Sequence, residues 1–144
     1  MDSCRRAYIK KDALMGIRDC AARSTGEVGG MLIGSVGKDK CVKITEFIEA
    51  KNAPSSPRGV TFTRRAWKGM RRAAKKCKGA KAVGWYHSHP SLGVFLSAAD
   101  LRLHRIFFNK KHQVALVIDP KSNECAIFGW AGRDVSACRL FYMV

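Results

Sequence analysis

The sequence predicts one mixed α/β domain, of the α+β kind, in which helices cover the faces of a single mixed sheet. The chain has 144 residues, a length that suits one domain with a modest core. Hydrophobic residues make up 47% and charged residues 26%, proportions that exclude a disordered or low-complexity chain. Segments with strand and helix periodicity follow one another in the order β-α-β-β-α-β-α-β-β-β. We therefore expect residues 1–144 to form a single domain.

The first half of the chain predicts a helix between strands. A short strand closes at residues 8–9, and apolar residues spaced three and four apart predict a helix over 10–23. Two apolar runs, 27–36 and 40–50, predict strands that are joined by a Gly-Lys-Asp hairpin turn. Proline, serine and glycine predict a loop over 51–61.

The second half predicts two further helices and four strands. Residues 63–78 carry one apolar stripe on an otherwise basic helix, which Gly79 would cap. Residues 82–89 predict a buried strand that a proline stops. A helix over 97–109 begins at a serine N-cap and is apolar enough to be sandwiched between other elements. The closing strands are expected at residues 113–119, 124–131 and 135–143.

The composition is strongly basic, with 27 Lys and Arg against 11 Asp and Glu and a formal charge of +16. Such a chain attracts polyanions, acidic proteins or acidic membrane surfaces, and the charge alone does not make nucleic acid its target. The apolar segments 28–37 and 82–99 are too short or too polar to span a membrane. The N-terminal residues lack the apolar region of a signal peptide. We expect a cytoplasmic protein that does not act at a membrane.

Six cysteines are present, and none forms the C-x-x-C pair of a zinc ribbon. In a cytosolic mesophile they are expected to be reduced, buried and apolar in behaviour. In a hyperthermophile some would form disulfides, and the sequence does not select which.

The stretch that carries chemistry is H-S-H-P-S-L-G-V-F-L-S-A-A-D, residues 87–100. Alternate residues of a strand point to one face, so His87 and His89 project two imidazoles from the same surface. Asp100, in the first turn of the next helix, can return a carboxylate to them. Two imidazoles and a carboxylate suit Zn²⁺, and three protein ligands leave a fourth position for water, as in catalytic sites.

Each part of this pattern also has a purely structural explanation. Two histidines on a strand are usually polar residues near a sheet edge. Ser97-x-x-Asp100 is an ordinary helix start, since both residues suit a first turn. Histidines inside an otherwise apolar strand need polar partners, which favours the metal site.

H-S-H-P, six residues, then S-x-x-D resembles the signature of the JAMM/MPN+ zinc metallo-isopeptidases (Mov34/MPN/PAD-1 type), and all the fixed positions match. Glu27, in E-V-G-G-M-L-I-G, resembles the upstream glutamate of that family. V-G-W-Y, F-L and V-A-L-V-I-D-P resemble its flanking segments, so the similarity spans residues 5–130. It looks closest to the proteasome-lid deubiquitinase and to compact archaeal members. The resemblance implies an MPN-type domain with a curved mixed sheet and a cytidine-deaminase-like core.

The resemblance also implies a role for each site residue. His87, His89 and Asp100 would hold one Zn²⁺ per chain. Glu27 would be the general base toward water, and Ser97 would help to stabilise the tetrahedral oxyanion. The residues expected to contact substrate are Trp85 just before the motif, Phe95 within it, and Pro54 and Gly59 in a short modifier-contacting insertion.

The implied reaction is hydrolysis of the isopeptide or peptide bond after the C-terminal Gly-Gly of ubiquitin or a ubiquitin-like modifier. An extended Gly-Gly tail can add to a sheet edge through backbone hydrogen bonds. A proteasome-like or other protein assembly is a further implied partner. The chain shows no long second insertion, no second Cys/His zinc cluster and no helical C-terminal extension, which is typical of a catalytic core or a compact archaeal member.

Three other functions compete with this one. Bacterial DNA-repair-associated proteins share an H-x-H-P and S-x-x-D pattern, and a charge of +16 suits a phosphate backbone. The serine between the histidines and the F-L before Ser97 favour the isopeptidase. A zinc deaminase would need H-x-E and P-C-x-x-C, which are absent. A metal-free scaffold module typically lacks a ligand, the glutamate or the serine, and all of them are present here.

Overall fold

A computed structural model describes residues 5–24, 26–50, 55–56, 59–60 and 62–144. Its elements follow the predicted order, with a short hairpin added inside the predicted loop 51–61. The strands are β1 (Arg6–Lys10), β2 (Gly29–Val36), β3 (Val42–Glu49), β4 (Ser55–Ser56), β5 (Gly59–Val60), β6 (Lys81–Ser88), β7 (Val114–Asp119), β8 (Glu124–Ala131) and β9 (Asp134–Met143). The helices are α1 (Lys11–Ala22), α2 (Arg64–Ala74) and α3 (Ala98–Phe107).

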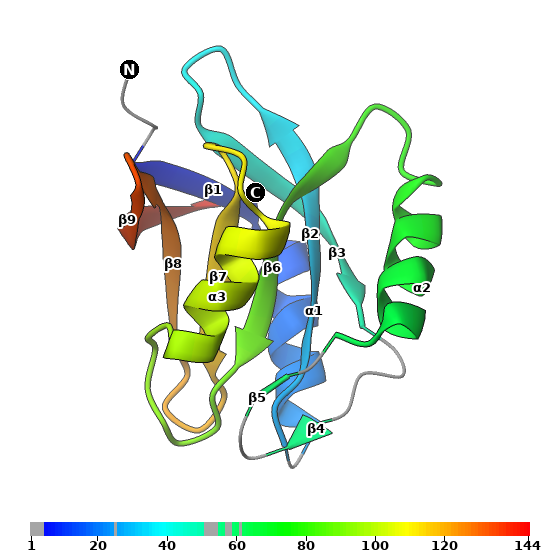
Figure 1. Cartoon of the computed structure of the whole chain (residues 1–144), viewed down its shortest axis with the longest axis vertical. Coiled ribbons are helices and arrows are strands. Elements are labelled where there is room, and N and C mark those ends of the chain that lie inside the picture. The colour runs from blue at the N-terminus through cyan, green and yellow to red at the C-terminus, as the bar shows by residue number, and fades with distance from the viewer. Residues whose placement is uncertain (1–4, 25, 51–54, 57–58, 61) are drawn as a thin grey trace.

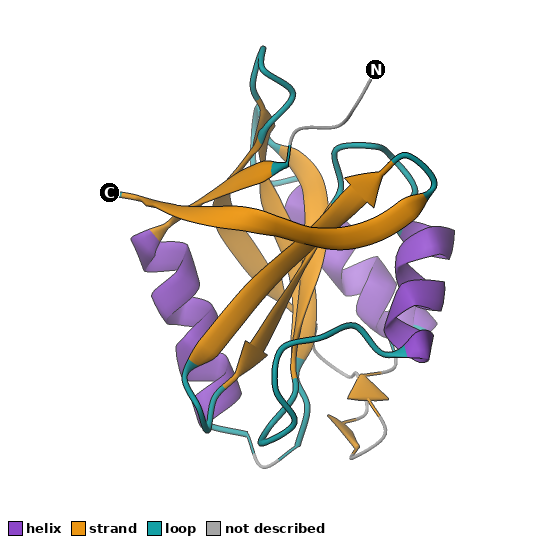
Figure 2. Cartoon of the chain, turned by 90° about the vertical axis from the view of Figure 1, so that its left-hand side faces the viewer, coloured by secondary structure: helices purple, strands orange, loops and turns teal. Residues whose placement is uncertain are grey.

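The main sheet is mixed, as predicted, and within the described residues it closes into a barrel in the order β1-β3-β2-β6-β7-β8-β9. Closure comes from the parallel pairing of β1 with β9, in which Tyr8 lies opposite Phe141. Their rings stack with centroids 5.5 Å apart. Figure 2 shows β9 crossing in front of the other strands on its way to the C-terminus. The sequence did not predict this closure, because it joins the first strand to the last.

The helices pack on two sides of the central strands β2 and β6 (Figure 1). Leu14 of α1 packs into the main core with Leu32 of β2, and both are nearly inaccessible to solvent. The next residue toward the N-terminus of β2, Met31, points the other way and packs with Met70 of α2. A third cluster around Phe108 lies beneath α3. Neighbouring side chains of β2 thus point into different clusters, so α1 lies on one side of the sheet and α2 and α3 lie on the other.

Two details of the helix predictions are wrong. Helix α2 ends at Ala74 with Lys75 as its C-cap, and Gly79, at φ +75°, lies in the following turn. Helix α3 is not sandwiched, because Ile106 and Phe107 are 60% and 50% exposed. The C-terminal end of α3 therefore presents apolar side chains to solvent.

The cysteines do not share one state. Cys41 is disulfide-bonded, whereas Cys20, Cys77, Cys125 and Cys138 are free. The sequence left open whether any cysteine forms a disulfide, and in the structure Cys41 does. Cys20 is buried, and the other three free thiols are half-buried.

None of the helices in the part of the chain that the structure describes is long and apolar enough to cross a bilayer.

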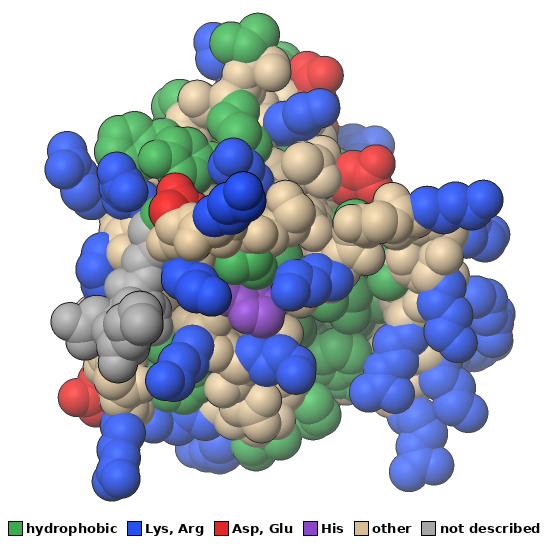
Figure 3. Space-filling view, turned by 90° about the horizontal axis from the view of Figure 1, so that it is seen from above, with side chains coloured by type: hydrophobic (Ala, Val, Ile, Leu, Met, Phe, Trp, Pro, Cys, Tyr) green, Lys and Arg blue, Asp and Glu red, His purple; other side chains and the backbone are tan. Residues whose placement is uncertain are grey.

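The large positive charge is visible on the surface. Figure 3 shows Lys and Arg side chains on much of the upper face and few acidic ones.

Candidate metal centre

The end of β6 places two imidazoles on the side of the sheet that α3 covers. His87 is 1% exposed and His89 is 3% exposed. Their ring centroids are 4.5 Å apart, and the ring of Trp85 stacks on His87 at 4.6 Å. The backbone N–H of His89 donates to the carbonyl of Ile118 on β7 at 2.8 Å, which continues the β6–β7 pairing beyond the end of the strand. The predicted common face of the two histidines is confirmed.

Asp100 reaches the imidazoles from the first turn of α3. Its Oδ2 atom lies 2.9 Å from Nε2 of His87 and 3.2 Å from Nε2 of His89. Ser97 is the N-cap of the helix, and its Oγ accepts a hydrogen bond from the Asp100 N–H at 3.1 Å. Asp100 Oδ2 accepts in turn from the Ser97 N–H at 2.9 Å. The capping box that starts α3 therefore also positions the Asp100 carboxylate beside the two imidazoles.

The geometry fits a small divalent cation. The Nε2 atoms of His87 and His89 are 2.9 Å apart, and both face the same Asp100 oxygen. Within the described part of the chain, His87, His89 and Asp100 lie close enough together to form a candidate metal site. A tetrahedral zinc site with bonds of about 2.0–2.1 Å separates its ligand atoms by about 3.3 Å, close to what is seen here. Three electron-pair donors that converge on one point are satisfied together by a cation.

Glu27 approaches the cluster from the segment that precedes β2. Its carboxylate Oε1 lies 3.7 Å from Nε2 of His89, and the residue is 5% exposed. Ser88 holds this segment in place, because its Oγ accepts from the Val28 N–H and its N–H donates to the Val28 carbonyl, both at 2.9 Å. The predicted strand began at Glu27, whereas β2 begins two residues later, at Gly29.

Burial and the hydrogen bonds within the cluster together set the protonation of the site. Burial raises the pKa of the Glu27 carboxyl, and the nearby Asp100 charge adds to the increase while His89 opposes it. Burial lowers the pKa of His87, which favours the neutral, metal-binding imidazole. Burial opposes ionisation of Asp100 too, but hydrogen bonds from His87 and His89 hold its pKa well below the usual range. The site therefore combines an ionised carboxylate with a second carboxyl that retains a proton more readily.

The residues expected to contact substrate differ in their exposure to solvent. Phe95 is 45% exposed with its ring 4.8 Å from His89, so it is accessible beside the cluster. Trp85 is 1% exposed, and its Nε1–H donates to Nδ1 of His104 at 3.0 Å, so it is buried behind His87. Gly59 pairs with Ser56 in the β4–β5 hairpin, which lies at the end of the molecule where β6 ends (Figure 1). Pro54 lies outside the described residues.

Sequence reasoning missed residues that support the site, Ser88 and Asp119 above all. Asp119 ends β7 and is 3% exposed. Its carboxylate accepts from the N–H groups of Ser91 and Gly93, each at 3.0 Å, and so holds the loop between the second histidine and α3. Although burial opposes it, these backbone donors lower the pKa of Asp119 to about 2. The sequence did carry a signal for Asp119, because this aspartate ends an otherwise apolar strand that pairs with the strand of the histidines.

His104 makes stability depend on pH. It is fully buried, and burial, with the nearby Arg105 charge, lowers its pKa from 6.5 to about 4. As the pH falls, the unfolded chain therefore takes up the proton before the folded chain does. The contribution of buried, neutral His104 to the free energy of unfolding is complete above the unfolded pKa and is lost as the pH falls to about 4. The loss amounts to about 3 kcal/mol.

We expect His104→Gln to remove most of this pH dependence. Chemical denaturation at neutral pH and at about pH 4 measures it. His112→Gln, at a half-exposed histidine, is the control and should keep most of the dependence. An unchanged dependence in His104→Gln would contradict the assignment.

A mixed barrel with a buried two-histidine, one-aspartate cluster and an adjacent glutamate has the features of a metal-dependent hydrolase. The family model described as JAB1/Mov34/MPN/PAD-1 ubiquitin protease matches residues 2–112. The chain therefore belongs to this family, as the histidine motif predicted.

Several proteins of known name are similar to parts of this chain. NAD(+) hydrolase TcpA of Theionarchaea archaeon is 38% identical over 98 residues, which are 66% of this chain and 28% of that protein. Ubiquitin carboxyl-terminal hydrolase RPN11 of Saccharomyces cerevisiae is 29% identical over 128 residues, 83% of this chain and 40% of that protein. COP9 signalosome complex subunit 5 of Kluyveromyces lactis is 35% identical over 107 residues, 67% of this chain and 26% of that protein. The match thus covers 40% or less of each of these relatives.

The fold is confirmed by a solved structure. The solution structure of protein DSY2949 from Desulfitobacterium hafniense aligns with a TM-score of 0.76, over 95% of this chain and 92% of that chain. The two sequences are 21% identical, so this likeness supports the fold alone.

Proposed function

We propose that residues 1–144 act as one catalytic domain, a zinc-dependent isopeptidase that cleaves after the C-terminal Gly-Gly of a ubiquitin-like modifier. The observation that carries the proposal is the convergence of His87, His89 and Asp100 with Glu27 3.7 Å from His89. Family membership and the similarity to ubiquitin carboxyl-terminal hydrolase RPN11 support it.

His87, His89 and Asp100 would hold one zinc ion per chain. A zinc ion in such a site supplies Lewis acidity and lowers the pKa of water to about 7. Glu27, buried and with a raised pKa, would accept a proton from the attacking water and deliver it to the nitrogen of the leaving amine. Water adds to the carbonyl carbon, the C–N bond breaks, and the products are a carboxylate and a free lysine amine. The burial of Glu27 suits it to hold the proton between these two steps.

Ser97 is proposed to donate its hydroxyl hydrogen to the developing oxyanion. Its Oγ already accepts from the Asp100 N–H, and a hydroxyl that accepts one hydrogen bond can still donate another. The residue is half-buried at the edge of the cluster, so a substrate carbonyl can reach it.

Two substitutions separate this role from helix capping. We expect Ser97→Ala to lose about 0.5–2 kcal/mol of stability and about 10²–10³ in kcat. Ser97→Asp keeps an N-cap but places an anion where the oxyanion forms, so it should stay folded and be at least as inactive. Turnover is compared at equal zinc content. Activity that returns in Ser97→Asp would mean that Ser97 is a cap only.

Substrate contacts are proposed at Phe95 and along the β4–β5 hairpin that contains Gly59, with Pro54 as a further candidate. The accessible ring of Phe95 suits an apolar contact near the scissile bond. Trp85 is too buried for that role, and we propose instead that it positions His87 by stacking.

The proposed partners are conjugates of ubiquitin or of a ubiquitin-like modifier, in the cytoplasm and within a proteasome-like or other assembly. The similarity to COP9 signalosome complex subunit 5 of Kluyveromyces lactis supports an assembly. The DNA-repair-associated alternative draws support from the shared H-x-H-P and S-x-x-D pattern and from the +16 charge.

The deciding assay offers the purified chain two substrates separately. One is ubiquitin joined through its Gly-Gly terminus to a lysine side chain, together with short Gly-Gly–lysine isopeptides. The other is NAD⁺, because one relative carries the name NAD(+) hydrolase, although the match covers 28% of that protein. The proposal predicts a free lysine amine and no nicotinamide. Release of nicotinamide without isopeptide cleavage would overturn it.

A further inference from the structure

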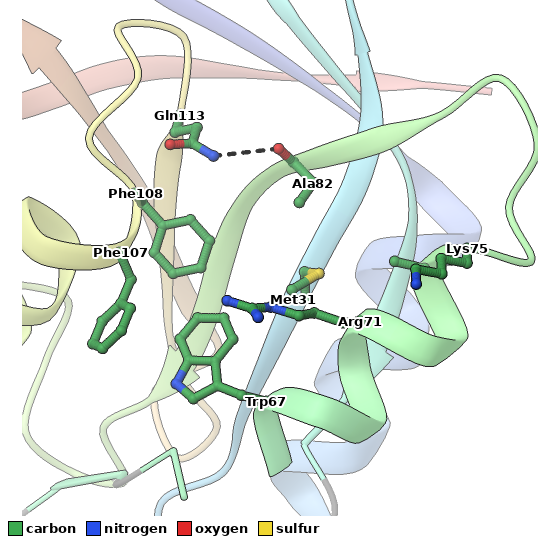
Figure 4. A pocket seen from close by; sticks show the side chains of 9 residues that line it. Met31, Trp67, Arg71, Lys75, Ala82, Phe107, Phe108 and Gln113 are labelled. Atoms are coloured by element: carbon green, nitrogen blue, oxygen red, sulfur yellow. Dashed lines mark hydrogen bonds between the residues drawn. The ribbon is translucent and has the colours of Figure 1, made fainter. Parts of the chain in front are cut away.

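A cavity of about 310 Å³ lies between α2 and α3, and it contains none of the metal-cluster residues. Met31 of β2 and Ala82 of β6 form its base, and Trp67 and Phe108 form an aromatic wall (Figure 4). Its volume is at the lower end of the range of about 300–1,000 Å³ for ligand sites, so it suits a single large side chain better than an extended ligand.

The two helices meet at this cavity through aromatic rings. Trp67 of α2 lies 4.9 Å from Phe107 of α3 and 5.7 Å from Phe108, measured between ring centroids. Phe107 is half exposed, and Ile106 beside it is 60% exposed. Phe107 therefore extends the apolar lining of the cavity to the exposed surface of α3.

Two cations border the cavity on the α2 side. Arg71 and Lys75 are one helical turn apart, and Figure 4 shows the Arg71 guanidinium reaching over the cavity toward Phe108. Neither forms a salt bridge with any residue that the structure describes. Figure 3 shows Lys and Arg side chains gathered on the side of the molecule where α2 lies, next to exposed hydrophobic surface. Further basic residues extend this charge along the helix: Arg64, Arg65, Lys68 and Arg72.

Gln113 is 7% exposed, and its side chain is hydrogen-bonded within the chain. Its amide nitrogen donates to the Ala82 carbonyl at 3.4 Å, and its Oε1 accepts from the Lys110 N–H at 3.0 Å. The cavity thus offers mainly apolar surface and positive charge, and the amide among its lining residues already bonds within the chain. An apolar side chain flanked by carboxylates complements it better than a nucleic acid does.

We propose that this cavity docks an acidic peptide segment of a partner protein, which seats one apolar side chain between α2 and α3. Carboxylates on either side of that anchor meet Arg71 and Lys75, and the basic length of α2 attracts the rest of the segment. The site goes beyond the proposed isopeptidase activity, because it needs neither the metal ligands nor Glu27.

The test measures fluorescence anisotropy of dye-labelled peptides with the full chain at low salt. The first peptide consists of Asp and Glu around one central Phe, and the second has Ser in place of that Phe. The third probe is an oligothymidylate of the same length. We expect the Phe peptide to bind at least about tenfold more tightly than the Ser peptide.

Matched substitutions on α2 locate the site. Arg71→Gln/Lys75→Gln should weaken the Phe peptide at least about tenfold, whereas Arg72→Gln/Lys76→Gln, with the same loss of charge, should change it less than about threefold. Ala74→Leu, which fills the cavity from α2, should weaken binding by about tenfold without a loss of charge. Circular dichroism confirms that each variant is folded.

Each other outcome overturns the proposal. If the Phe peptide does not bind, or if the Ser peptide binds equally well, then no apolar side chain anchors the segment in the cavity. Equal losses in the two charge pairs would mean attraction to bulk charge. Tighter binding of oligothymidylate that Arg71→Gln/Lys75→Gln abolishes would make this a nucleic-acid site.

Discussion

Purified His87→Ala/His89→Ala is expected to retain almost no zinc and to cleave isopeptide conjugates at least about a thousandfold more slowly than the native chain. The substitution leaves Asp100 as the sole member of the ligand set, and one carboxylate does not hold zinc in a protein site. Metal content by plasma mass spectrometry and turnover of a ubiquitin–lysine conjugate measure the two effects.

The matched control is His112→Ala, which removes a half-exposed histidine outside the cluster. It should keep both zinc and turnover. Full zinc occupancy in the His87→Ala/His89→Ala variant would place the metal elsewhere in the chain.

Glu27→Gln is expected to keep its zinc and to lose at least about a hundredfold in turnover, since glutamine keeps the size of the side chain but cannot take up a proton. Zinc should be retained because the ligand set does not include Glu27, whose carboxylate lies 3.7 Å from His89. Glu124→Gln, at an exposed glutamate on β8, controls for the loss of one negative charge. Near-normal turnover in Glu27→Gln would require another base.

The cluster of His87, His89 and Asp100 could be predicted because its determinants are local. The period of a strand fixes His87 and His89 on one face, and the capping arrangement of Ser97 and Asp100 turns the carboxylate back toward them. These residues lie within one strand, one loop and one helical turn. The family resemblance added Glu27, which the strand pattern alone would have left as an ordinary strand-start carboxylate.

Features that depend on distant pairings could not be predicted. Ser88 fixes the segment of Glu27 by bonds to Val28, a residue sixty positions earlier in the chain. Barrel closure likewise depends on the register of Tyr8 with Phe141. Apolar content gives no information on such pairings, because many partners would satisfy the same strand pattern.

The prediction that α3 is sandwiched between other elements failed for a different reason. Asp100, His104 and Phe108 are four residues apart and form its buried stripe. Ile106 and Phe107 fall outside this stripe and face solvent. The apolar count of a helix therefore overstates its burial when polar site residues occupy the inward face.

Isopeptide hydrolysis by this chain is proposed to require a zinc ion held by His87, His89 and Asp100. The most direct measurement removes metal from the native chain with a chelator and returns zinc in known amounts while turnover of a ubiquitin–lysine conjugate is followed. We expect no turnover in the metal-free protein and a linear recovery that stops at about one zinc per chain. Full turnover by protein shown to be free of metal would contradict it.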